Sequence, residues 1–320
     1  MKDALAIVLF VLAVGAAALW FDSGVALNFI MMTLYATQMA QAWNMLGGFG
    51  GQFSFGHALF FGSGAYVQAM AQLHGGINAW VALLLAVGAA AGVGALVGTL
   101  AFRYGLKGSY FALITLAFAE VFRILALSLP FTGAGVGLML PLHAAASNLQ
   151  FGSPRGFVLL VLAFVALALG VTAWLRHSRF GAQLQAVRDN EDAARALGID
   201  PLRTKLGACV LSAAFMGAAG AFYLQAFQYI DPAIAFGPTT SVEALLGAIV
   251  GGMGTLWGPV LGALALHALS DLTRNLFGAM PGINMVIYGV VLVLIVVFMP
   301  RGMAGIGRSV RTLWQEGRRG

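Results

Sequence analysis

Residues 23–102 contain no Asp, Glu, Lys or Arg, so a quarter of the chain has no charged side chain. Over all 320 residues, 60% are hydrophobic, 9% are charged and the mean hydropathy is +0.90. A soluble globular domain carries roughly 25% charged residues, so this chain cannot cover a surface that faces water on all sides. The period-2 segments of a transmembrane β-barrel are absent. We therefore predict an all-α polytopic membrane protein.

A helix needs about 20 mainly apolar residues to cross a bilayer. The segments that approach this criterion are residues 4–21, 27–46, 54–73, 79–101, 109–128, 156–176, 204–228, 239–251, 257–273 and 281–300. The segment 239–251 is too short to cross alone, which favours a half-helix or a merger with its neighbour. The first segment is also compatible with a secretory signal peptide, but Trp20 at its end is typical of an interfacial anchor.

Basic residues gather in the loop 103–107, in the segment 176–205 and in the tail 301–320. The positive-inside rule places all three in the cytoplasm. Because an even number of crossings must separate cytoplasmic segments, we predict one transmembrane domain over residues 1–320 with about ten crossings. Both termini are then inside, and the uncharged loop 130–154 is outside. The net charge of +6 reflects this orientation and does not indicate nucleic-acid binding.

Residues 176–205, which we call the charged island, hold ten of the 28 charged side chains (17 basic plus 11 acidic). Residues 181–188 predict one short helix. A second helix follows, with an N-cap, acids in its first turn, alanines on its packing side, charges outward and a glycine stop. An ordinary amphipathic loop is the alternative. The residues of this second helix are Asp189 (the N-cap), Glu191, Asp192, Ala193, Ala194, Arg195 and Gly198 (the stop).

Glycine is unusually frequent and forms two glycine blocks, residues 47–51 and 251–254, each between two predicted spans. The blocks predict a weak internal repeat, with broken helices beside a pathway through the membrane. The alternative is that small residues simply let helices pack closely.

Few ionisable residues lie within the spans. Glu120 and Arg123 share a helix face, and charges near a bilayer either pair or face a cavity. We favour a salt bridge between helices or subunits over a place on a substrate path. Glu243 follows three hydroxyl residues, 239–241, which are predicted to cap a half-helix. Its carboxylate either lines a path or complements the helix dipole.

Other classes of site lack their motifs. The five histidines show no H-x-x-x-H or H-x-H spacing, and the single cysteine excludes a disulfide framework. No G-x-x-x-x-G-K-[ST] motif for nucleotide binding is present, and no catalytic constellation can be defined. We therefore expect no cofactor, no metal and no enzyme activity in this chain. If transport uses ATP, another chain must bind it.

The charged island resembles a known motif. The run Asp192-Ala193-Ala194-x-x-x-Gly198 is similar to the EAA-x-x-x-G loop of ABC importer permeases, although Asp replaces the usual Glu and the downstream I-x-L-P is missing. Over nearly its whole length the chain resembles the branched-chain amino-acid permeases of the LivM type. The segments that carry this resemblance are residues 43–66, 108–123, 178–206, 251–263 and 296–306.

The resemblance implies a permease subunit of an ABC importer for branched-chain amino acids in a bacterial inner membrane. It implies that the island forms a coupling helix that docks on an ATPase subunit. The implied partners are a homologous LivH-type permease, two cytosolic ATPase subunits, a periplasmic substrate-binding protein and membrane lipid.

The translocation path of such a permease would be lined by small and polar groups. Our candidates for it are Asn44, Gln52, Ser54, Tyr110, Glu120 and Glu243. One alternative is an ABC permease for urea, short amides or aromatic acids. Another is an ion-coupled secondary transporter without ATPases, which would need a carboxylate such as Glu120 beside a cavity.

Overall fold

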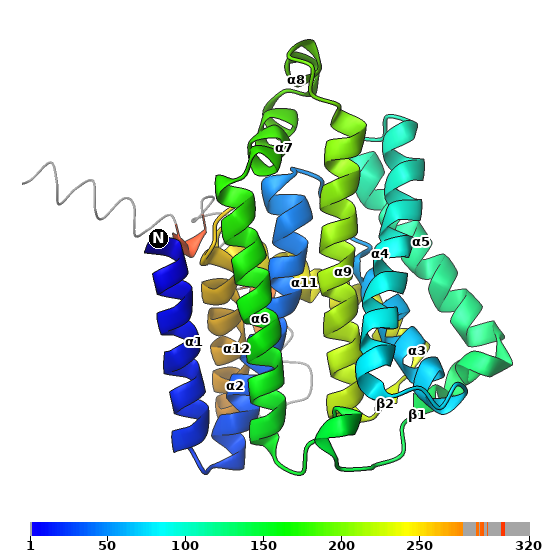
Figure 1. Ribbon diagram of the computed structural model, residues 1–320, viewed down its shortest axis with the longest axis vertical. Coiled ribbons are helices and arrows are strands. Elements are labelled where there is room, and N and C mark those ends of the chain that lie inside the picture. The colour runs from blue at the N-terminus through cyan, green and yellow to red at the C-terminus, as the bar shows by residue number, and fades with distance from the viewer. Residues whose placement is uncertain (1, 278–285, 288, 291–292, 294–301, 305–320) are drawn as a thin grey trace, which may run out of the picture.

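The computed structural model describes residues 2–277, 286–287, 289–290, 293 and 302–304, and they form a bundle of helices (Figure 1). Within these described residues, five helices are long and apolar enough to cross a membrane, which confirms the predicted polytopic all-α class. They are α1 (Lys2–Trp20), α4 (Ala79–Arg103), α5 (Ser109–Ser128), α6 (Pro154–His177) and α9 (Pro201–Phe227).

The other long elements of the bundle are four helices of 14 to 20 residues and one π-helical segment. They are α2 (Gly24–Trp43), the π-helix η1 (Asn44–Phe49), α3 (His57–Leu73), α11 (Pro238–Gly251) and α12 (Gly258–Phe277). At 1.5 Å per residue, the 14 residues of α11 extend about 21 Å, short of a hydrocarbon core of about 30 Å. The predicted short segment is thus confirmed. The span 281–300 and the tail 301–320 lie mostly outside the described residues, so the number of crossings stays a prediction.

Small residues let α9 lie at the centre of the bundle, against α3 and α4. A Cβ on Gly217 would overlap Ala90 of α4, and one on Gly220 would overlap the Phe61 carbonyl of α3. Lipid is as apolar as leucine, so helices in a membrane gain little from burying apolar surface and associate through such close packing.

The helix α1 lies at one edge of the bundle beside α6 (Figure 1), and Ala18 is its one buried residue. Charged groups hold both of its ends to α6. Near its start, the Asp3 carboxylate accepts hydrogen bonds from Arg176 at 3.3 Å and His177 at 2.8 Å. Just past its end, Asp22 pairs with Arg155.

The uncharged loop and the charged island lie at opposite ends of the bundle (Figure 1). At the loop end, strand β1 (Leu138–Met139) pairs antiparallel with β2 (Tyr229–Ile230), and the short helix α10 (Pro232–Phe236) follows. The loop also contains three 3₁₀ turns, η2 (Pro130–Thr132), η3 (Ala134–Val136) and η4 (Ala146–Asn148). At the other end lie α7 (Arg179–Asp189) and α8 (Glu191–Ala196).

The predicted caps of the half-helix α11 are wrong. Its N-cap is Gly237, with Pro238 at the first helical position and no capping side chain. The hydroxyl of Ser241 instead accepts a hydrogen bond at 2.8 Å from the backbone N–H of Ala58, in the first turn of α3. The start of α11 therefore caps a different broken helix, which a local pattern cannot reveal.

Candidate functional site

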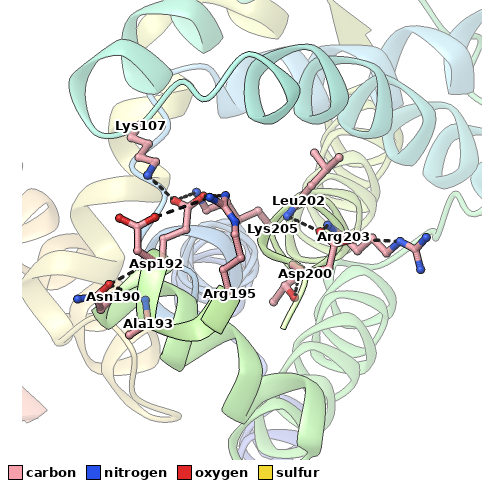
Figure 2. A network of polar contacts seen from close by, with 11 residues as sticks. Lys107, Asn190, Asp192, Ala193, Arg195, Asp200, Leu202, Arg203 and Lys205 are labelled. Carbon is pink, nitrogen blue, oxygen red and sulfur yellow. Dashed lines mark hydrogen bonds and ion pairs between the residues drawn. The ribbon is translucent and has the colours of Figure 1, made fainter. Parts of the chain in front are cut away.

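The charged island forms two short helices joined at a single residue. Helix α7 is longer than predicted because the Ser178 hydroxyl caps it, accepting from the N–H of Gly181 at 3.0 Å. Helix α8 is also capped, but by Asn190 and not by the predicted Asp189, which is the last residue of α7. The Asn190 side-chain oxygen accepts from the N–H groups of Asp192 at 3.1 Å and Ala193 at 3.0 Å (Figure 2).

The end of α8 is set by Gly198, as predicted. Gly198 adopts φ +83°, a left-handed conformation that favours glycine, and its N–H donates to the Arg195 carbonyl at 3.0 Å. On the packing side Ala194 is buried, whereas Ala193 is exposed. Asp192 and Arg195 point outward as expected, so α8 presents a charged, solvent-facing surface at the end of the molecule.

Glu191 does not point outward, which corrects the prediction for this residue. Its side chain is 15% exposed and pairs with three cations, which together form an ion cluster of Glu191, Lys107, Lys205 and Arg195. The carboxylate lies 2.6 Å from Lys205 Nζ, 3.0 Å from Lys107 Nζ and 3.5 Å from an Arg195 nitrogen. Burial opposes ionisation of Glu191, but the hydrogen bonds from Lys205 and Lys107 prevail and hold its pKa below the ordinary value.

This ion cluster fastens α8 to the bundle. Lys205 belongs to the first turns of α9 and is 4% exposed, while Lys107 comes from the loop between α4 and α5. Sequence reasoning counted both lysines only as orientation signals. Lys205 is the last residue of the island, but Lys107 lies in a separate basic loop, and no spacing rule joins residues 107, 191 and 205.

We expect Glu191→Ala to weaken the docking of α8 by about 2 kcal/mol, because it leaves the buried Lys205 ammonium without its carboxylate. Hydrogen exchange of the α8 amides, measured by mass spectrometry, would show a matching loss of protection. Arg203→Ala is the control: its pair with Asp200 is exposed at 87% and 50% and should contribute almost nothing. Equal protection in both variants would contradict the role of the cluster.

The two glycine blocks meet in the folded chain, and we call their contact the glycine junction. Asn44, at the start of η1, holds them together. Its side-chain oxygen accepts from the N–H of Gly254 at 2.7 Å, and its side-chain nitrogen donates to the Thr255 carbonyl at 3.0 Å. Asn44 is fully buried, so both hydrogen bonds are made away from water. The contact joins the broken region after α2 to the turn after α11.

Three of the candidate path residues, Asn44, Gln52 and Ser54, are buried at or near this junction. The Gln52 side chain donates to the Gly50 carbonyl at 3.1 Å, and the Ser54 hydroxyl accepts from the N–H of Gly56 at 3.2 Å. These bonds brace the non-helical segment between η1 and α3. The three residues thus lie within eleven positions of one another, in η1 and in the non-helical segment that follows it.

The other three candidates, Tyr110, Glu120 and Glu243, lie apart from that group and are exposed on this chain. Tyr110 and Glu120 belong to α5, and Glu243 belongs to α11. Glu120 is paired within its own helix: Arg123 donates to its two oxygens at 2.6 and 2.8 Å. Glu243 forms no ion pair with any residue that the structure describes.

Comparison with known proteins identifies the family. The family model for the permease component of the branched-chain amino acid transport system matches residues 25–296. The chain belongs to this permease family. It is therefore a multi-pass membrane component of a transport system. No solved structure gives a significant match to this permease chain.

The relatives of this permease are named for different solutes. LivM of Salmonella typhimurium, named a high-affinity branched-chain amino acid permease, is 29% identical over 87% of this chain and 69% of its own length. A probable LivH permease of Methanocaldococcus jannaschii is 31% identical over 50% of this chain and 52% of its own. The fructose import permease FruF of Bifidobacterium longum is 26% identical over 61% of this chain and 53% of its own.

Proposed function

We propose that this chain is the transmembrane permease subunit of an ABC importer for branched-chain or similar hydrophobic amino acids. The whole of residues 1–320 would form one permease domain in a bacterial inner membrane, with both termini in the cytoplasm. The chain would pair with a LivH-type permease, two cytosolic ATPase subunits that hydrolyse the ATP, and a periplasmic binding protein. We expect no cofactor and no catalytic residue in this chain.

The family match together with the geometry of α8 supports this proposal. An ATPase in the cytoplasm needs a firm, water-exposed projection to push on. Helix α8 projects from the end of the bundle (Figure 1), is capped at Asn190, stops at Gly198 and is fastened through Glu191. The residues proposed to couple to the ATPase are Asp189, Glu191, Asp192, Ala193, Ala194, Arg195 and Gly198. Of these, Glu191 would act by positioning α8.

Co-purification tests the assignment. The chain is co-expressed with candidate ATPase and second-permease subunits from the same genome, and the complex is captured through a tag on this chain. We expect the wild-type chain to retain the ATPases and Ala194→Glu to lose them, because a carboxylate at this buried alanine displaces α8. Ala182→Glu is the control, because Ala182 is an exposed alanine of α7 outside the proposed coupling residues, and it should retain the ATPases. Uptake without any ATPase would instead support an ion-coupled transporter.

A sugar is the second candidate solute, because one relative is named a fructose import permease. Calorimetry on the substrate-binding protein that supports uptake through this chain decides between the two. Binding of leucine or isoleucine without binding of fructose supports the amino-acid assignment, and the opposite result supports a sugar. Urea, short amides and aromatic acids belong in the same panel of ligands.

A substitution at Glu120 tests whether the Glu120–Arg123 pair on α5 contributes to assembly or lines the substrate path. The pair is 49% and 29% exposed on a spanning helix at the edge of the bundle opposite α1 (Figure 1), where charges are costly unless covered. We expect Glu120→Gln to reduce recovery of the second permease, because Arg123 loses its partner.

The double variant Glu120→Gln/Arg123→Gln removes both charges and should recover part of the assembly. The measurement is the yield of assembled complex, followed by competition of uptake among different amino acids. Normal assembly with an altered substrate preference would place Glu120 on the path instead.

A further inference from the structure

We propose that Arg188 is a positioning residue that carries movement of the coupling helix α8 to the glycine junction. The inference rests on the proposed function, since it assumes that an ATPase moves α8. Arg188 lies in the last turn of α7, two residues before Asn190, and the pattern of the sequence gave it no role.

The Arg188 side chain reaches from the island into the membrane bundle. Its Nη1 donates to the carbonyl of Gly48 at 3.1 Å, within η1. Its Nε donates to the carboxylate of Asp189 at 3.0 Å, which fixes the guanidinium from the other side. A hydrogen bond from a charged donor is roughly twice as strong as a neutral one. One side chain thus joins α7 to the broken helix after α2.

Glycines make room for this side chain. Gly51 adopts φ +65°, and a Cβ there would overlap Cγ of Arg188. A Cβ on Gly254, in the second block, would lie 3.6 Å from Nη1. The stem of Arg188 therefore lies on the first glycine block and its head group adjoins the second. A side chain at Gly51 would displace it.

The contacts form a continuous chain from the surface to the junction. Asn190 caps α8 and directly follows α7, so the two short helices share one link. Arg188 then contacts Gly48, and Asn44 joins that segment to Gly254. Because these contacts are hydrogen bonds with defined geometry, a shift of α8 that keeps the bonds at Arg188 and Asn44 moves both blocks.

The test follows the junction directly. Met253, in the second block, is 43% exposed, whereas the chain's single cysteine, Cys209, is buried. In the complete transporter carrying Met253→Cys, a thiol reagent therefore reports on the junction. We expect a non-hydrolysable ATP analogue to change the labelling rate several-fold, and Arg188→Ala to abolish that change and lower uptake about tenfold while ATPases remain bound.

Arg179→Ala is the matched control, because Arg179 is an exposed arginine of the same helix and pairs with no described acid. It should keep the nucleotide response. A response of wild-type size in Arg188→Ala overturns the inference. If that variant does not reach the membrane, Arg188→Met decides: it keeps an unbranched stem but has no N–H to donate to the Gly48 carbonyl, and a wild-type response in it is equally decisive.

Failure of the proposed function would look different. A wild-type chain that retains no ATPase refutes the assignment as an ABC permease, and the inference falls with it. A wild-type chain that retains the ATPases and responds to nucleotide, beside an Arg188→Ala chain that responds equally, refutes the inference alone.

Discussion

Replacing Gly198 with proline will lower ATP-driven uptake by roughly a hundredfold, while the chain still inserts into the membrane. Proline fixes φ near −65°, whereas Gly198 adopts +83°. Proline also has no N–H, so the hydrogen bond to the Arg195 carbonyl is lost. The end of α8 must then unwind. The measurement is uptake by the assembled transporter, together with ATP hydrolysis and the amount of chain in the membrane.

Gly198→Ala is the control for this variant. No atom lies within 4 Å of a Cβ at this position, so alanine adds only the strain of a left-handed residue, about 1–2 kcal/mol. We expect a loss of tenfold or less. Uptake at the wild-type rate in Gly198→Pro would show that the stop of α8 is irrelevant to coupling.

Replacing Gly48 with alanine will destabilise the folded chain by about 3 kcal/mol, because the glycine junction has no space for a methyl group. A Cβ at Gly48 would overlap the side-chain oxygen of Asn44 and lie 2.5 Å from the backbone nitrogen of Gly254. Backbone cannot swing aside as a flexible side chain can, so the two glycine blocks must separate. Thermal unfolding in detergent should show a lower midpoint.

Gly88→Ala in α4 is the matched control: it makes the same substitution at a position that has room for a methyl group. No atom lies within 4 Å of a Cβ at Gly88, and alanine is favoured over glycine within a helix by about 0.5–1 kcal/mol. Its midpoint should stay level or rise. Equal midpoints for the two variants would mean that the close approach at Gly48 does not contribute to stability.

Apolar length predicted the helices well because it is a local property of the chain. The span 109–128 coincides with α5, and the predicted start of the fourth span, residue 79, is the start of α4. The end of α8 at Gly198 was also predictable from local sequence, because a glycine that follows a run of helix formers commonly ends the helix. The half-helix at 239–251 followed from length alone.

Contacts between distant segments could not be predicted in this way. Ser241 is a residue type that often caps helices and lies near the start of α11, but its hydroxyl instead caps α3 at Ala58, 183 residues earlier in the chain. Glu191 has the position of an outward acid, but Lys107 and Lys205 draw it inward. Asn44 stays a candidate for the translocation path, and its hydrogen bonds to Gly254 and Thr255 join segments more than 200 residues apart. In each case a partner outside the local window decided the role.

The attachment of α1 has a practical consequence. The side chains of α1 contribute little to the core, but Asp3 and Asp22 join the two ends of this helix to α6. Helix α6 leads directly into α7. Because α1 is joined to α6 at both ends, it should tilt together with α6. A fluorophore placed at residue 2 would therefore report the tilt of α6 during the transport cycle, from a position that leaves the moving surfaces untouched.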